Sequence, residues 1–295
     1  MFTLITSDIS RVLCSVQRVG YQLNRENQEL EDLVGEDSRT SLVPSVARAA
    51  AILDLLGETG GSLASNEIAR QLGIPKSSTA NICLELESLG YLVRRDNGYR
   101  LGRKLVELGG KYLSSIDALR EYYDLCSSLP ILSRESSRIA ILDGTDVLYL
   151  GKYEGRQQIR LTANIGDRFP AICTATGKAL MALLPVGEAE QRYRENPSAF
   201  VPLTEKSIRT VEELSKDLAA IRERGYSIDN EETTPGVICF AIAISGFRGD
   251  TSAVAVSATA LVQRVTPEFR QSLLKDLYAL GKGLSNPLTM SEHRK

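Results

Sequence analysis

Residues 65–101 carry the sequence pattern that most constrains how this chain can fold. Ser65 is a favourable N-cap for a short helix, and Gly73 ends that helix because glycine readily adopts a left-handed conformation. Pro75 cannot continue a helix but is tolerated at the start of the next one. A helix, a glycine-containing turn, a second helix and a hairpin follow one another. This order predicts a winged helix-turn-helix, whose second helix enters the DNA major groove.

The second helix of this segment is expected to have one buried and one polar face. Ile82, Leu86 and Leu89 repeat at helical spacing and predict the buried stripe. The short polar side chains on the other side suit a surface that faces a DNA groove. The preceding helix, predicted from Ser45 to Gly57, adds one arginine that could reach phosphate. The predicted DNA-contacting residues are Arg48, Lys76, Ser77, Ser78, Thr79, Asn81, Arg94 and Arg95.

A hairpin with two adjacent arginines distinguishes this segment from an ordinary helix pair in a protein core. Asn97-Gly98 predicts a two-residue type I′ turn, which requires a positive φ at both positions. Between residues 70 and 104, seven basic residues face three acidic ones, a net charge of +4. The whole chain has a net charge of -2, which leaves -6 for the remainder. A basic module on an acidic body is typical of a protein that touches DNA with one end.

Composition excludes several classes of function. The chain has no run of about 18 apolar residues and no basic, apolar leader at its start, so we expect neither a membrane span nor a secretory signal. Five scattered cysteines without a C-x-x-C pair indicate a cytoplasmic location. The single histidine, His293, is third from the end, which argues against serine or cysteine hydrolase chemistry. We therefore expect no catalytic residue, no metal and no cofactor.

At 295 residues the chain is long enough for two domains. Residues 1–42 are predicted to be an extension with an amphipathic helix, which could serve self-association, form a mere tail, or reflect a start codon assigned too early. The winged helix-turn-helix is predicted over 43–103 and a linker helix over 104–130, with a break or hinge at Gly109-Gly110. The second domain spans 131–288 and a tail 289–295.

The second domain alternates β-rich segments with amphipathic helices. Strands are predicted at 138–142, 147–150, 158–162, 239–244 and 253–257. Helices are predicted from Thr176, from a capping box at Thr210 and from Thr266-Pro267. The pattern indicates an α+β fold with a mostly antiparallel sheet. Gly177-Lys178 lacks the rest of a phosphate-binding loop, and Asp229, Glu231 and Glu232 are interpreted as a solvated face rather than an acid/base pair.

Several short motifs occur in an order that resembles the IclR family of bacterial transcriptional regulators. They are Ser45-Val-Ala-Arg48-Ala, Pro75-Lys-Ser-Ser-Thr79, Gly166-Asp-Arg-Phe-Pro170, Thr176-Gly-Lys-Ala179, Ile221-Arg-Glu-Arg-Gly-Tyr226, Asp229-Asn-Glu-Glu232, Gly236-Val-Ile-Cys239 and Val256-Ser257. The resemblance covers roughly residues 43 to 288. It implies a winged-helix domain, a linker helix and a GAF-like effector domain. It also implies dimers, often paired into tetramers, and a small organic acid or related metabolite as ligand.

The resemblance also implies where an effector would bind. By motif position, the pocket residues are Cys173, Ala175, Thr176, Asp229, Cys239, Ala255 and Ser257. Family members often carry a serine where this chain has Ala255, which suggests a less polar or differently held ligand. We expect Thr176 to cap the helix that follows it, whose positive end favours an anion. Plain core packing is the alternative for Cys173 and Cys239, because free cysteine is commonly buried.

The leading hypothesis is an allosteric transcription factor. A metabolite bound to the second domain would alter how paired winged-helix domains, in a homodimer or homotetramer, bind a palindromic double-stranded operator. A second hypothesis is a metabolite-processing enzyme whose helix-turn-helix is only structural. A third is a sensor that has lost its ligand and acts through protein contacts. The sequence leaves the ligand, the operator and the sign of regulation open.

Overall fold

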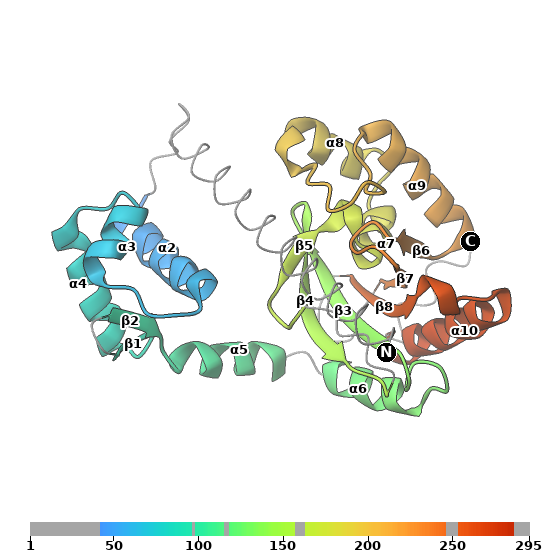
Figure 1. The fold of residues 1–295 in the computed structure, drawn as a ribbon, viewed down its shortest axis with the longest axis horizontal. Coiled ribbons are helices and arrows are strands. Elements are labelled where there is room, and N and C mark those ends of the chain that lie inside the picture. The colour runs from blue at the N-terminus through green and yellow to red at the C-terminus, as the bar shows by residue number, and fades with distance from the viewer. Residues whose placement is uncertain (1–41, 96–97, 115–117, 157–162, 246–252, 286–295) are drawn as a thin grey trace, which may run out of the picture. The chain divides into compact units, whose positions relative to one another are not determined.

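The chain divides into two compact units (Figure 1). The computed structural model describes residues 42–95, 98–114, 118–156, 163–245 and 253–285. The first unit comprises the described residues up to Ser114, and the second those from Ala118 onward. The helix predicted within the N-terminal extension, the strand predicted at 158–162 and the tail at 289–295 lie outside the described residues.

The first unit packs helices against a β-hairpin. Its elements are α2 (Pro44–Thr59), α3 (Ser65–Gln71), α4 (Lys76–Ser88), β1 (Leu92–Arg95), β2 (Gly98–Leu101) and α5 (Lys104–Ser114). Gly73 follows α3 with a φ of 62°, as predicted. The predicted N-cap is wrong by one residue, because Ser65 is already helical and Ala64, which has no side-chain hydroxyl, precedes it.

Helix α4 buries a different stripe from the predicted one. Thr79, Cys83 and Leu86 point into the core of the first unit, whereas Leu89 is 54% exposed. Ile52 and Leu56 of α2 belong to the same buried set. The buried face of α4 therefore consists of Thr79, Cys83 and Leu86, and not of the predicted Ile82, Leu86 and Leu89.

The two strands of the hairpin form as predicted, but Gly98, predicted as a turn residue, is the first residue of β2. Strands β1 and β2 are antiparallel, and Arg95 pairs with Gly98, so this glycine is a strand residue and not part of the turn. The two residues between them lie outside the described residues. A Cβ on Gly98 would come within 2.8 Å of the Leu63 backbone. That backbone exchanges two hydrogen bonds with Tyr99, of 3.1 and 2.8 Å, and so adds a third, very short strand to the wing.

The predicted linker comprises two separate helices. Helix α5 continues through Gly109-Gly110, so the break expected at these glycines is wrong. Helix α6 (Ala118–Ser128) belongs to the second unit. Its buried Tyr122 donates a hydrogen bond of 3.0 Å to the hydroxyl of Ser137 on the sheet. The second half of the predicted linker therefore belongs to the core of the second unit.

The second unit is built on one antiparallel sheet. Its strands are β3 (Ser136–Asp143), β4 (Asp146–Tyr153), β5 (Arg168–Pro170), β6 (Ser227–Asn230), β7 (Val237–Ile244) and β8 (Val254–Leu261). The spatial order is β5-β4-β3-β8-β7-β6, and every neighbouring pair is antiparallel. Strands β3 and β8 therefore occupy the centre of the sheet. The short edge strands β5 and β6 were not predicted from the sequence.

Helices cover both faces of this sheet (Figure 1). One face packs against α7 (Ala175–Leu183), which is covered in turn by α9 (Val211–Arg224) with α8 (Glu188–Glu195) beside it, and the other face packs against α6 and α10 (Pro267–Leu284). The predicted caps at Thr210 and Thr266 are confirmed, since each hydroxyl accepts a backbone N–H three residues later at 3.2 Å. The predicted α+β class is confirmed. Within the described ranges, no helix is long and apolar enough to cross a membrane.

Candidate DNA-reading surface and effector pocket

The start of α4 presents short polar side chains to solvent. Lys76, Ser77 and Asn81 are exposed, and Ser78 is half-buried. Thr79 is fully buried, and its hydroxyl donates to the carbonyl oxygen of Pro75 at 3.2 Å, so it cannot contact DNA. Thr79 therefore does not belong to the DNA-contacting surface, contrary to the prediction. The exposed face that remains has the small size and the polarity that base-edge contacts require.

The two wing arginines point to opposite faces of the hairpin. Arg94 pairs with Tyr99, and its guanidinium carbon lies 5.4 Å from the centre of that ring, so the exposed side chain stacks on the Tyr99 ring. Arg95 lies on the other face, together with the exposed Arg100. Arg100 was missing from the predicted set, although strand alternation with Arg94 and Arg95 could have revealed it. Arg48, on α2, is half-buried and remains a predicted contact.

Arg95 and Arg94 form a matched pair for testing the wing. Arg95→Ala is expected to weaken binding to specific and random duplexes alike and to reduce the slope of log K against log salt by about one unit. Arg94→Ala should leave that slope unchanged and lower stability by about 0.5–1 kcal/mol through loss of the ring contact. Salt titrations of duplex binding with both variants check this. A slope unchanged in Arg95→Ala would show that this face of the wing does not touch phosphate.

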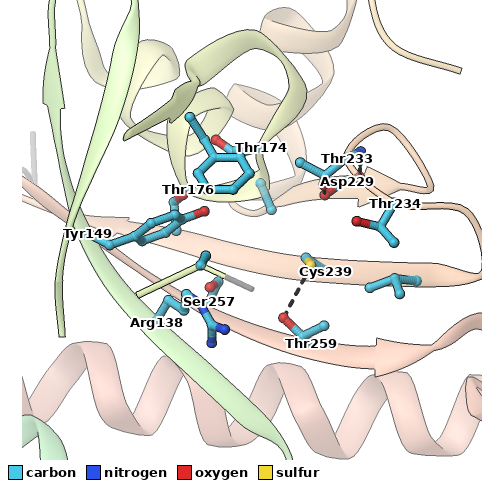
Figure 2. Close-up of a pocket in the computed structure, with 14 residues that line it drawn as sticks. Arg138, Tyr149, Thr174, Thr176, Asp229, Thr233, Thr234, Cys239, Ser257 and Thr259 are labelled. Atoms are coloured by element: carbon cyan, nitrogen blue, oxygen red, sulfur yellow. Dashed lines mark hydrogen bonds between the residues drawn. The ribbon is translucent and has the colours of Figure 1, made fainter. Parts of the chain in front are cut away.

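A small cavity lies between α7 and the sheet of the second unit (Figure 2). The volume of this cavity is about 50 Å³. Its lining residues come from β3 to β8, from the start of α7 and from neighbouring loops. They are Arg138, Tyr149, Ala163, Phe169, Thr174, Ala175, Thr176, Asp229, Thr233, Thr234, Val237, Cys239, Ser257 and Thr259.

Five of the seven predicted pocket residues line this cavity: Ala175, Thr176, Asp229, Cys239 and Ser257. The other two do not. Cys173 is fully buried in the core with its Sγ 3.4 Å from the carbonyl oxygen of Val201, and Ala255 is fully buried in the same core. For Cys173, core packing is the correct alternative. The absence of a serine at position 255 therefore removes no hydroxyl from the cavity of this chain.

The helix that starts at the cavity is capped by Thr174, not by Thr176. The hydroxyl of Thr174 accepts the N–H of Gly177 at 3.0 Å. Gly177 is needed because a Cβ there would lie 2.3 Å from the carbonyl oxygen of Ala171. The tight packing brings the first turn of α7 directly over the sheet. The hydroxyl of Thr176 is buried at the cavity close to the hydroxyl of Tyr149, and no hydrogen bond of 3.5 Å or less joins it to a described residue.

Asp229 is a buried acid at the end of β6, not part of a solvated face. It is 2% exposed, and one of its oxygens accepts the backbone N–H groups of Glu232 at 2.7 Å and Thr233 at 3.1 Å. The other accepts the hydroxyl of Thr233. Burial, reinforced by the neighbouring Glu232, raises the pKa of Asp229 to about 7. The interpretation of these carboxylates as exposed was therefore wrong for Asp229 and for Glu232, which is 8% exposed.

A buried ion-pair network fixes the loop that follows Asp229. Lys178 of α7 is 1% exposed and lies 2.5 Å from Glu232 and 2.8 Å from Asp217 of α9. Burial lowers the pKa of Lys178, but the two carboxylates raise it by more, so the ammonium stays charged. Glu231 adopts a left-handed φ of 64°, which is rare for a residue with a side chain. The network thus holds a strained turn beside the cavity.

The thiols of the second unit are poor nucleophiles. Burial raises the pKa of Cys173 to about 12, and burial together with Asp229 raises the pKa of Cys239 above its ordinary range. Since the thiolate is the reactive form, neither group is activated at neutral pH. The four cysteines in the described part of the chain are unpaired, and no cluster of metal-binding side chains occurs in that part. The site favours reversible binding over covalent chemistry.

Comparison with known proteins agrees with this two-part arrangement. The sequence profile "IclR helix-turn-helix domain" matches residues 45–96, and "Bacterial transcriptional regulator IclR C-terminal" matches residues 110–286. The HTH-type transcriptional regulator XynR of Escherichia coli is 33% identical over 252 residues, which cover 83% of this chain and 99% of XynR.

Solved structures of other proteins share the fold of this chain over most of its length. A transcriptional regulator structure from Rhodococcus superposes with a TM-score of 0.70 at 26% identity and covers 85% of this chain and 100% of its own. An IclR homologue from Microbacterium hydrocarbonoxydans, in complex with 4-hydroxybenzoate, shares the fold at a TM-score of 0.68 and 21% identity, over 81% of this chain and 98% of its own. The chain described here belongs to the IclR family of bacterial transcriptional regulators.

Proposed function

We propose that this chain is a DNA-binding transcriptional regulator whose operator affinity responds to a small metabolite held in the cavity of the second unit. The exposed polar start of α4 and the arginine face of the wing, which belong to the same compact unit, support the DNA-binding part of the proposal. In this arrangement α4 lies in the major groove, and Arg95 and Arg100 face the phosphate backbone. Action on chromosomal DNA implies a cytoplasmic protein.

Self-association is part of the proposal. Helix α5 exposes apolar side chains, with Val106 76% and Leu108 41% exposed. An apolar helix face of this kind supports a homodimer, or a homotetramer built from two dimers, and two paired reading helices would select a palindromic operator. The elevated thiol pKa values and the lack of a histidine in the described part of the chain support a regulator without enzymatic activity.

Asn81 tests base reading. Asparagine pairs best with adenine in the major groove, so Asn81→Ala is expected to cost about 1–3 kcal/mol on the specific operator and almost nothing on random DNA. An operator can first be selected from a random duplex library with the full-length protein. Ser88→Ala is the matched control, because Ser88 is exposed at the C-terminal end of α4. This variant should bind both DNAs normally. Equal losses of Asn81→Ala on both DNAs would contradict base reading by this residue.

The effector-dependent part of the proposal has a separate test. A thermal-shift screen of small metabolites with the full-length protein identifies ligands, and a DNA-shift assay with each ligand measures the change in operator affinity. A ligand that binds both conformations equally would alter nothing, so a regulatory effector must change the DNA affinity. A protein that binds its operator but responds to no metabolite would be a sensor without a ligand.

A further inference from the structure

Arg138 is a buried cation whose main hydrogen-bonding edge is unused. It lies on the central strand β3, is 3% exposed and lines the cavity beside Ser257 of β8. Its Nη1 makes one long contact of 3.4 Å to the carbonyl oxygen of Ser137. Its Nε and Nη2 atoms have no acceptor in the described part of the chain. Because buried unpaired donors on a charged group are costly, this edge is poised for an acceptor that the chain does not supply.

The unused edge has the shape of a carboxylate receptor. The N–H groups of Nε and Nη2 are parallel and match the two oxygens of a carboxylate, a pairing that fixes both the charge and the orientation of a ligand. The unpartnered hydroxyl of Thr176, 2% exposed, lies on the α7 side of the same cavity, as Figure 2 shows. It sits in the first turn of α7, where free N–H groups and the helix dipole favour an anion.

The opposite end of the cavity carries an acidic side chain in place of the arginine. Asp229 stands three strands away from Arg138, on β6, and Figure 2 shows it with Thr233 and Thr234 at that end. A carboxylate has about four acceptor positions, and three are used by the contacts described above. The thiol of Cys239, the cross-strand neighbour of Asp229, and a donor from a ligand can both reach the remaining acceptor position. The ionised form of Asp229 would repel a second anionic group placed there, and with its pKa raised to about 7 a part of this carboxyl is ionised at neutral pH.

Hydroxyl groups line the space between these two ends. Ser257 and Thr259 project from β8, and the thiol of Cys239 on β7 lies 3.2 Å from the hydroxyl of Thr259. Hydroxyl side chains both donate and accept, so they complement hydroxyl groups of a ligand. These side chains favour a hydroxylated ligand over a purely apolar one.

The spacing of the strands sets the length of such a ligand. Three strand spacings place the backbones of β3 and β6 about 14 Å apart. The long arginine side chain and the aspartate side chain cover much of that distance from the two ends. The remaining gap suits a chain of a few carbon atoms.

We propose that the effector is a short aliphatic hydroxycarboxylate, with its carboxylate on Arg138 and Thr176 and a hydroxyl donating to Asp229. This inference rests on the proposed function and deepens it, because it names the ligand class and assigns Arg138 as the residue that selects it. Neither the family resemblance nor the motif positions pointed to Arg138.

Three-carbon probes separate the two ends of the proposed site. Glycerate carries a carboxylate and two hydroxyls, propionate only the carboxylate, and glycerol only hydroxyls. Calorimetric titration of the full-length protein should show binding of glycerate, binding at least about tenfold weaker for propionate, and none for glycerol. The four-carbon 2,3,4-trihydroxybutanoate tests the length and should bind at least as well as glycerate.

Arg138→Gln tests the anchor. It keeps a polar side chain but loses the charge and the paired donors, so glycerate affinity should fall by about 10- to 150-fold. The control is Arg192→Gln, a half-buried arginine of α8 that does not line the cavity, and it should bind glycerate normally. Far-UV circular dichroism and operator binding show that each variant is folded.

The outcomes separate this inference from the proposed function. Propionate binding as well as glycerate, or Arg138→Gln retaining full affinity, would overturn the ligand class. A protein that ignores every hydroxycarboxylate but answers to another metabolite in the screen would also overturn it and leave the proposed function standing. A protein whose DNA binding answers to no metabolite would overturn both.

Discussion

Lys178→Met is expected to lower the free energy of unfolding of the second unit by about 3–5 kcal/mol. The substitution keeps the length and the apolar part of the side chain but removes the buried ammonium. Glu232, 2.5 Å from that ammonium, would be left without its cation, whereas Asp217, at 2.8 Å, would keep only its longer contact of 3.4 Å with Arg224. The loss arises mainly from uncompensated buried charge. Urea unfolding of the full-length protein, followed by circular dichroism and by hydrogen exchange of peptides from α7, measures it for this unit.

Two further variants isolate the cause. Lys206→Met breaks a neighbouring pair with Glu231 in which the lysine is 55% exposed, so it should cost no more than about 1 kcal/mol. Lys178→Met combined with Glu232→Gln removes one of the stranded charges and should recover part of the loss. If Lys178→Met and Lys206→Met proved equally mild, the buried network would contribute little, and the turn beside Asp229 would be held by its backbone hydrogen bonds.

Ser257→Phe is expected to abolish the response to the effector while leaving operator binding intact. Ser257 lies on β8 between Arg138 of β3 and Ala241 of β7, so a phenyl ring at this position would fill the cavity. Overpacking should cost about 1–3 kcal/mol of stability, which leaves a folded protein. Thermal shift with the strongest ligand from the metabolite screen and operator affinity, measured on the same sample, check both parts.

Ser257→Ala is the matched control for this substitution. It removes the hydroxyl but leaves the cavity open, so the thermal shift should be reduced rather than lost. A full response in Ser257→Phe would place the effector site outside this cavity. A loss of operator binding together with the response would instead show that the substitution had disturbed the fold.

Local sequence signals predicted much of this fold because local physics decides those elements. Thr210 and Thr266 cap their helices through contacts three residues away, and Gly225 ends α9 with a φ of 80°. The face of α4 was predicted wrongly because its apolar residues follow two overlapping stripes. Only packing against α2 shows that Cys83, and not Leu89, is buried.

The effector site was harder to predict because it depends on contacts between distant segments. Arg138 is the first residue of the predicted strand 138–142, and a charged residue at such a position is usually exposed. Only the order of the strands shows that it lies on a central strand of the sheet, where it is buried. Asp229 is close in sequence to other acids, and nothing local shows that it is buried. Thr174 and Thr176 are equally good caps by composition, and the close approach of Gly177 to Ala171 decides between them.

The short third strand of the wing has a consequence for building hybrid regulators. Leu63 precedes α3, yet its backbone pairs with Tyr99 behind the tip of the hairpin. A graft that exchanged only α3 and α4 between two regulators would combine this pairing strand from one parent with a wing from the other. The natural cassette for transplanting operator specificity therefore runs from Leu63 through Leu101. Within it, Gly98 must stay a glycine, because a Cβ there would lie 2.8 Å from the backbone of Leu63.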